Sequence, residues 1–215
     1  MKKIYALLVA LVLTSVITSD LKAQFTAGVD LYSSYVWRGS KFAGPSVQPS
    51  VKFTAGGLTA GVWGSYDFSG YKETDPYISY SLPIGLSIGV TDYYYEGDIT
   101  DFSDSTGSHA LEVNLGYTIK GLSLAGNYIV NEAGGAASMG GDMYFQATYA
   151  FSSFSAFIGA GNGWHTSDSE FNVCNIGIQA SKSIELTDKF SIPVTGQVIV
   201  NPDKKQLFMV VGLSF

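Results

Sequence analysis

Residues 45–68 read PSVQPSVKFTAGGLTAGVWGSYDF. Apolar and polar residues alternate on both sides of Gly56-Gly57, which is typical of two β-strands joined by a tight turn. The same alternation continues through the chain. Including segments 45–55 and 58–68, it predicts twelve strands, the others being 25–38, 74–82, 84–95, 109–119, 122–131, 142–151, 154–164, 171–184, 189–200 and 206–215.

The connections between these segments alternate in length. Short turns fall at 56–57, 83, 120–121, 152–153 and 185–188, and longer loops at 39–44, 69–73, 96–108, 132–141, 165–170 and 201–205. Strands of about 9–11 residues suffice to cross a bilayer when tilted, and this asymmetry is typical of bacterial outer-membrane barrels. We therefore predict an all-β, transmembrane, antiparallel up-and-down β-barrel with short periplasmic turns and longer extracellular loops. We expect no loop to be long enough to form a substantial plug.

The composition excludes several other classes. Hydrophobic residues make up 46% of the 215 residues and charged residues only 14%, whereas charged residues are about a quarter of a typical soluble domain. Disorder, a coiled coil, a helical membrane bundle and a disulfide scaffold are all disfavoured. The net charge of -6 and the absence of a basic run argue against nucleic-acid binding. The length suits one domain.

The N-terminus predicts export. Met1-Lys2-Lys3 is a positive region, Ile4 to Ile17 is an apolar run, and Ala23 is a small residue before a cleavage point. Residues 1–23 are therefore predicted to be a signal peptide, and residues 24–215 the barrel domain of a Gram-negative outer membrane, with both termini periplasmic.

Three features favour an apolar face that contacts lipid. Charged and amide side chains on the other face suit a wet lumen and not a dry core. Val211, Leu213 and Phe215 end the chain in phase, like the C-terminal signal read by the barrel assembly machinery. Aromatic residues of the apolar face sort into two predicted interfacial girdles: Phe25, Phe53, Phe151, Phe154, Phe190 and Phe215 at the turns, and Tyr35, Trp37, Tyr66, Phe68, Tyr94 and Tyr128 at the loops. By phase, Cys174 is expected to face lipid and His109 the interface.

The first strand carries a family motif. Tyr35, Trp37, Arg38 and Gly39 lie within YSSYVWRGS, residues 32–40, which resembles the S-x-Y-x-[FW]-R-G stretch of the TorF-type (Gcw_chp) porins. Chain length, Gly- and Tyr-rich strands and an aromatic C-terminus are also similar. Val210 departs from the fuller C-terminal pattern, which prefers Gly there. The resemblance implies an outer-membrane porin-like protein of undetermined substrate, and it supplies no catalytic residue.

The predicted lumen offers a few candidates for ion selectivity. Arg38 either biases the pore mouth or pairs with an inward acid. Asp30, Asp67 and Glu112 are the acids in suitable phase, and Lys52 is a further inward cation. The excess of acids hints at weak cation preference.

We expect passive diffusion of small solutes or ions through a narrow lumen, in contact with outer-membrane lipid and lipopolysaccharide. A structural or lipopolysaccharide-contacting barrel without an open pore is the alternative, with Trp63, Tyr77, Tyr144 and Phe157 as side chains that would fill it. A lipid hydrolase using His165 and Ser167, with Glu170 nearby, is less favoured. No cofactor or metal site is predicted, because Asp98 to Asp104 lack the order of a calcium loop.

Overall fold

The computed structural model of the protein describes residues 23–215. The predicted signal peptide, residues 1–23, lies outside them apart from Ala23. Regular structure in the described part consists of β-strands and two short 3-10 segments, η1 (Gly134–Ala136) and η2 (Gly163–His165). No helix in this part of the chain is long and apolar enough to cross a membrane.

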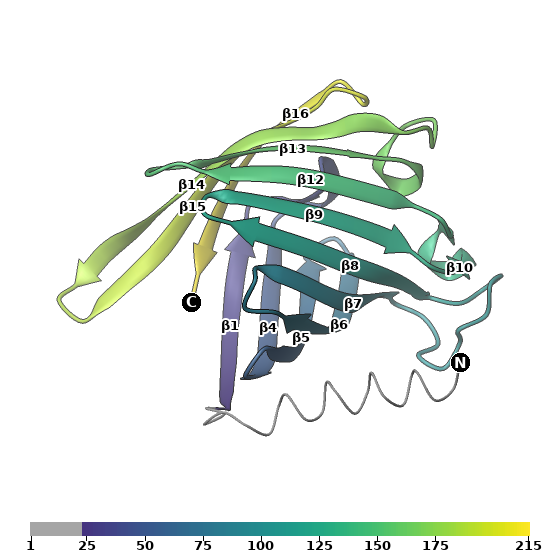
Figure 1. The fold of residues 1–215 in the computed structure, drawn as a ribbon, viewed down its shortest axis with the longest axis horizontal. Coiled ribbons are helices and arrows are strands. Elements are labelled where there is room, and N and C mark those ends of the chain that lie inside the picture. Colours follow the sequence, from purple (N-terminus) through teal and green to yellow (C-terminus); the bar gives the residue numbers. More distant parts are fainter. Residues whose placement is uncertain (1–22) are drawn as a thin grey trace.

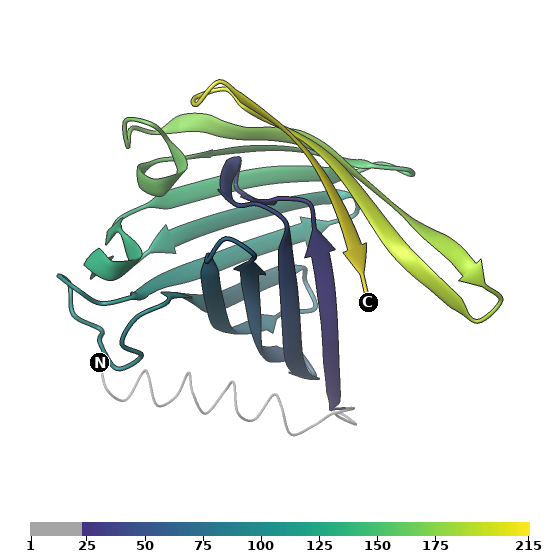
Figure 2. The ribbon, with the colours of Figure 1, turned by 180° about the vertical axis from the view of Figure 1, so that it is seen from behind.

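Twelve antiparallel strands close into one barrel (Figures 1 and 2). Successive barrel strands pair with each other, and β1 pairs with β16 to complete the ring. The predicted all-β, up-and-down barrel of twelve strands is therefore confirmed. Its strands are β1 (Gln24–Tyr32), β4 (Ser46–Ala55), β5 (Leu58–Asp67), β6 (Lys72–Ser81), β7 (Leu86–Tyr95), β8 (His109–Ile119), β9 (Leu122–Ile129), β12 (Met143–Ala150), β13 (Ser155–Gly161), β14 (Asn172–Thr187), β15 (Phe190–Asn201) and β16 (Gln206–Ser214).

The two ends of the barrel differ. At one end, here the turn end, the strands are joined by residues 56–57, 82–85, 120–121, 151–154 and 188–189. At the other, the loop end, they are joined by residues 33–45, 68–71, 96–108, 130–142, 162–171 and 202–205. Two of these loops form hairpins of their own, β2 (Tyr35–Trp37) with β3 (Ser40–Ala43), and β10 (Glu132–Ala133) with β11 (Ser138–Met139).

The apolar face of the sheet lies outside. Large aliphatic side chains alternate along the strands with inward polar or aromatic ones and are exposed, among them Ile78, Ile88, Leu115, Ile158 and Val211. A soluble barrel buries its apolar face, whereas a membrane barrel presents it to lipid. The outer surface has the character of a membrane barrel.

The first predicted strand is shorter than expected. Residues 25–38 alternate throughout, yet β1 ends at Tyr32 because the chain bends at Ser33-Ser34. The Ser33 N–H donates to the Val211 carbonyl, and its Oγ accepts from the Val211 N–H, which ends the pairing with β16. The alternation continues across the bend, so periodicity alone does not reveal it.

This bend corrects the predicted girdle at the loop end. Tyr35 and Trp37 lie in β2, inside the barrel, and Tyr35 is only 7% exposed. Other girdle residues are exposed as predicted, namely Tyr66, Phe68 and Tyr128 at the loop end and Phe25, Phe151, Phe154, Phe190 and Phe215 at the turn end.

Strands β14 and β15 extend past their neighbours at the turn end (lower left in Figure 1). The last β14 residue paired with β13 is Gln179, and the first β15 residue paired with β16 is Val194. Residues 183–193 therefore form a two-stranded ribbon paired only with itself.

Candidate functional site: a hairpin folded into the lumen

The β2–β3 hairpin occupies the loop-end half of the lumen (Figure 2, the dark segment above β1 and β4). Its turn is Arg38-Gly39, and both residues have positive φ, 50° and 81°. Two-residue hairpin turns of type I′ require positive φ at both positions. The turn contacts β8 on one side and β14 and β15 on another, so the hairpin spans the lumen.

Arg38 makes a buried ion pair across the lumen. Its Nη1 and Nη2 donate to Oε2 and Oε1 of Glu112 at 2.6 and 2.8 Å. The guanidinium also lies over the rings of Trp37 and Tyr144, 4.2 and 4.6 Å from their centroids. Of the acids that the sequence offers as partners, Glu112 makes the pair. Arg38 therefore fastens the hairpin to the barrel wall.

Neighbouring side chains also donate hydrogen bonds to Glu112. It is 1% exposed, and its Oε1 also accepts from the Tyr93 hydroxyl at 2.9 Å and from Asn114 Nδ2 at 2.6 Å. Several donors converge on one carboxylate, as a buried charge requires.

Gly39 fits against a β-bulge in β14. The register between β13 and β14 shifts so that Cys174 has no partner residue. A Cβ on Gly39 would lie 2.0 Å from the Cys174 carbonyl oxygen, so no larger residue fits without movement. Asn201 Nδ2 donates to the Gly39 carbonyl at 2.9 Å, and Lys204 Nζ donates to Ser40 Oγ at 2.8 Å.

Cys174 itself does not face lipid as predicted. It is fully buried at this bulge, because the extra residue in β14 changes the phase of the strand.

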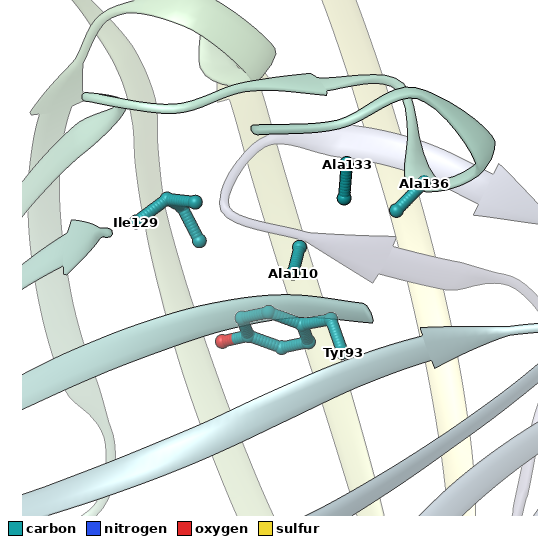
Figure 3. Close-up of a cluster of buried hydrophobic side chains, with 5 residues drawn as sticks. All are labelled: Tyr93, Ala110, Ile129, Ala133 and Ala136. Carbon is teal, nitrogen blue, oxygen red and sulfur yellow. The ribbon is translucent and has the colours of Figure 1, made fainter. Parts of the chain in front are cut away.

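Aromatic rings surround the hairpin. Trp37 contacts Tyr93, Trp164 and His165 at centroid distances of 5.3, 6.3 and 5.2 Å. Tyr35 contacts Trp63 at 5.4 Å. Figure 3 shows the small apolar cluster beside the hairpin, in which Tyr93 lies among side chains of β8, β9, β10 and η1: Ala110, Ile129, Ala133 and Ala136. The loop-end half of the lumen is thus filled, contrary to the expectation that no loop could plug it.

Two buried acids on β6 lie near the hairpin without a basic partner. Glu73 and Asp75 are 2% and 5% exposed. The Tyr71 hydroxyl donates to Glu73 at 2.7 Å, and the hydroxyls of Tyr35 and Tyr95 also hydrogen-bond to it. Oδ1 of Asp75 has no hydrogen-bond partner. Neither acid belongs to an ion pair within residues 23–215.

The turn-end half of the lumen is hollow and polar. Thr26, Ser50, Lys52, Thr118 and Ser181 lie there on inward-facing positions and are exposed. Two cavities of about 280 and 260 Å³ adjoin the hairpin, the first lined by Asp30, Gln48 and Gln197 among others, and the second by Arg38, Gln146 and Gln179 among others.

The remaining selectivity candidates therefore lie at different depths. Asp30 lines a cavity below the hairpin, and Lys52 is exposed in the hollow half. Asp67 does not reach the lumen: its Oδ1 accepts from the backbone N–H groups of Ser69 and Tyr71 at 2.8 Å each and closes the β5–β6 loop. Short polar side chains often satisfy turn backbone in this way, which explains the difference.

The His165 loop does not form a catalytic arrangement. His165 is 1% exposed, and its ring contacts Trp37 and Tyr144. Burial, together with the charges of Arg38 and Lys204, lowers its pKa to about 3, so the ring is neutral at pH 7. Ser167 is exposed, and within the described chain no hydrogen bond joins His165 to Ser167 or Glu170. His165 instead packs against the hairpin.

His109 is buried under the β7–β8 loop and does not serve as an exposed interfacial aromatic. Its ring stacks with Tyr94 and Phe102, with centroids 4.7 and 4.0 Å away. Nδ1 lies 2.8 Å from Asp92 Oδ2, and Nε2 lies 3.1 Å from the Ile99 carbonyl. These two contacts and the stacked rings fix the imidazole under the loop.

The predicted assembly signal lies in and just after β16. Val211 and Phe215 are exposed on the outer face, and Leu213 is half-buried. The Phe215 backbone exchanges hydrogen bonds with Val29 of β1 at 2.9 and 3.1 Å, so the end of the chain helps to close the barrel.

Several residues of the site are missed by sequence reasoning. Glu73 falls within a predicted loop and Asn201 at the start of another, but both lie in strands and face inward. The alternation of Glu73, Asp75 and Tyr77 with Thr74 and Pro76 is the signal that could have extended the predicted strand 74–82 back to Glu73.

Comparison with known proteins shows no family for this chain. No protein-family model and no curated protein matches the chain. Among solved structures, a mutant of the Rh. blastica porin is similar, with a TM-score of 0.41 and 15% identity, over 79% of this chain. The chain spans 55% of the length of that porin. The function proposed below rests on the geometry of this chain.

Proposed function

We propose that the protein is a porin-like channel of the bacterial outer membrane in which the β2–β3 hairpin restricts passive diffusion to small ions and solutes. The observation that carries this proposal is the hairpin held across the loop-end half of the lumen by Arg38 and Glu112, above a hollow polar half. A passage that is narrow at one level and wide below it selects by size and charge at the narrow level.

The outer surface supports the proposed location in the outer membrane. An exposed apolar band with aromatic residues near both ends suits a lipid bilayer. In that setting the turn end is periplasmic and the loop end extracellular, and β1 starts and β16 finishes toward the periplasm. The TorF-type resemblance is part of this proposal, and the motif residues from Tyr35 to Gly39 are the ones that build the hairpin.

A second candidate is a structural or lipopolysaccharide-contacting barrel without a path for ions. The close packing of Trp37, Tyr93 and His165 around the hairpin favours it. The two candidates differ in one measurable quantity, the conductance of the intact barrel and of a barrel without its hairpin.

The test is single-channel recording in planar bilayers. The mature protein would be compared with a variant in which residues 34–44 are replaced by a short Gly-Ser linker, and heat-modifiable migration on gels would confirm that both are folded. We expect small steps from the intact protein and several-fold larger steps from the variant. A folded variant without any conductance would overturn the channel proposal in favour of the structural barrel.

Selectivity supplies a further readout. Lys52→Glu changes a charge in the hollow half without touching the hairpin, and Asp30→Asn removes a charge next to it. Reversal potentials in a salt gradient should shift toward cations for the first variant and toward anions for the second. Unchanged potentials in both variants would mean that ions do not pass these residues.

A further inference from the structure

A separate cavity lies at the loop end, where three loops meet the hairpin. It measures about 350 Å³, within the range of about 300–1,000 Å³ that is common for ligand pockets. Its walls are residues 135–137 and four half-buried rings, here called the aromatic cage: Phe42, Tyr71, Tyr95 and Trp164.

The four rings of the aromatic cage form a chain of edge-to-face contacts. Phe42 and Tyr71, Tyr71 and Tyr95, and Tyr95 and Trp164 have centroids 6.2, 6.4 and 6.4 Å apart, at interplanar angles of 69°, 72° and 86°. Neighbouring rings thus meet edge to face and are not stacked.

Hydrogen bonds fix two of the cage rings, Trp164 and Tyr71. Trp164 Nε1 donates to the Ala137 carbonyl at 2.6 Å, and the Trp164 N–H donates to Asp142 Oδ2 at 3.1 Å. The Tyr71 hydroxyl is fixed on Glu73. A ligand therefore meets a preformed site and loses little affinity to ordering it.

Carboxyl groups lie behind the cage, and no basic side chain lines it. The hydroxyls of Tyr35, Tyr71 and Tyr95 hydrogen-bond to Glu73. No cation of the described chain pairs with Glu73, and Asp75, two residues along β6, has an oxygen without a partner. The surroundings of the cavity are therefore acidic and not basic.

The acids of the surrounding loops strengthen this bias. Apart from Glu96, which pairs with Lys72, acidic side chains outnumber basic ones on the outer loops of this end, with Asp98, Asp101, Asp104, Glu132, Asp168, Glu170 and Asp203 against Lys41, Lys204 and Lys205. A mouth lined by one sign of charge concentrates ligands of the opposite sign.

We propose that the aromatic cage binds a quaternary ammonium group, such as the trimethylammonium head of choline. Ring faces attract a cation through their quadrupole, and Trp gives the strongest attraction. Two of the cage tyrosines direct their hydroxyls at Glu73 and so do not offer them to a ligand. A methylated cation, which has no N–H donors to satisfy, suits such a lining better than a sugar or a primary amine.

The test is calorimetric titration of the folded protein in octyl glucoside, a detergent without an ammonium group. Choline would be compared with 3,3-dimethylbutan-1-ol, its uncharged carbon isostere. We expect choline to bind at least about tenfold more tightly than the isostere. Equal affinities would overturn the proposal and leave a merely apolar pocket, and absence of binding by choline would overturn it as well.

Variants place the site. Trp164→Leu removes a cage wall and should weaken choline binding about tenfold, whereas Phe154→Leu, an exposed aromatic at the turn end, is the matched control. Full binding by Trp164→Leu would place any choline site elsewhere. Because binding is measured without current, this proposal stands or falls separately from the channel.

Discussion

We predict that removing one partner of the Arg38–Glu112 ion pair destabilises the hairpin by an amount that depends on which partner is removed. Glu112→Gln leaves the Arg38 cation with two ring faces, and the loss of a partner from a buried pair costs about 3–5 kcal/mol. Arg38→Gln leaves Glu112 with donors from Tyr93 and Asn114, each worth about 1.5–3 kcal/mol to a charged acceptor. We therefore expect Glu112→Gln to destabilise the docked hairpin by about 1–2 kcal/mol more than Arg38→Gln does.

The double variant, Arg38→Gln with Glu112→Gln, completes a double-mutant cycle. With both charges gone, no uncompensated charge is left, so the combined cost should fall below the sum of the single costs by at least about 2 kcal/mol. The hairpin can also leave the lumen and hydrate Arg38, which limits the cost of Glu112→Gln to the free energy of docking. Urea titration in lipid vesicles followed by Trp37 and Trp164 fluorescence, together with conductance, measures both effects.

The outcome that contradicts this reasoning is specific. Additive costs, each below about 0.5 kcal/mol, would mean that water already separates the two charges. Equal costs for the two single variants would mean that Tyr93 and Asn114 do not support Glu112. The matched control is Lys72→Gln, which removes the exposed pair with Glu96 at the rim and should change stability by less than about 1 kcal/mol.

Three further changes test other parts of the site. Gly39→Ala places a Cβ against the Cys174 carbonyl and keeps a positive φ, so the hairpin should undock and trypsin should cut after Arg38 in the folded barrel; an uncut chain would contradict this. The folded pKa of His165 is about 3 against 6.5 unfolded, so the folded state resists protonation, and hairpin docking should weaken by about 1.4 kcal/mol per pH unit between 6.5 and 3. His165→Phe should remove this slope in conductance against pH, and an unchanged slope would assign it to another group. His109→Phe removes both polar contacts of the ring, and hydrogen exchange of residues 96–108 should then quicken.

The barrel could be predicted from the sequence because every barrel strand shows the same alternation of apolar and polar residues. In strands such as β5 and β8, alternation with a period of two separates a lipid face from a lumen face, and short turns such as Gly56-Gly57 fix the order of pairing. These signals are local, so each strand could be placed without knowledge of its neighbours.

The candidate site could not be predicted from the sequence, because it depends on the point at which the chain leaves the barrel sheet and enters the lumen. Tyr35 and Trp37 have the phase and chemistry of girdle residues, and only the bend at Ser33-Ser34 turns them inward. The bulge at Cys174, which receives Gly39, likewise changes phase within an apolar run. Sequence restricted the partner of Arg38 to three acids, but the choice of Glu112 depends on distances between strands far apart in the chain.

The contacts that hold the hairpin also allow it to leave the lumen without unfolding of the barrel. Its turn is held mainly by polar contacts, from Glu112, Asn201 and Lys204, and each of these groups gains water when the hairpin leaves. A hydrogen bond contributes about 1 kcal/mol net between neutral groups and about 1.5–3 kcal/mol where one partner is charged. The barrel ladder, in contrast, loses all of its strand pairing together. We therefore expect the hairpin to open at a lower free energy than any barrel strand, which is what a removable constriction requires.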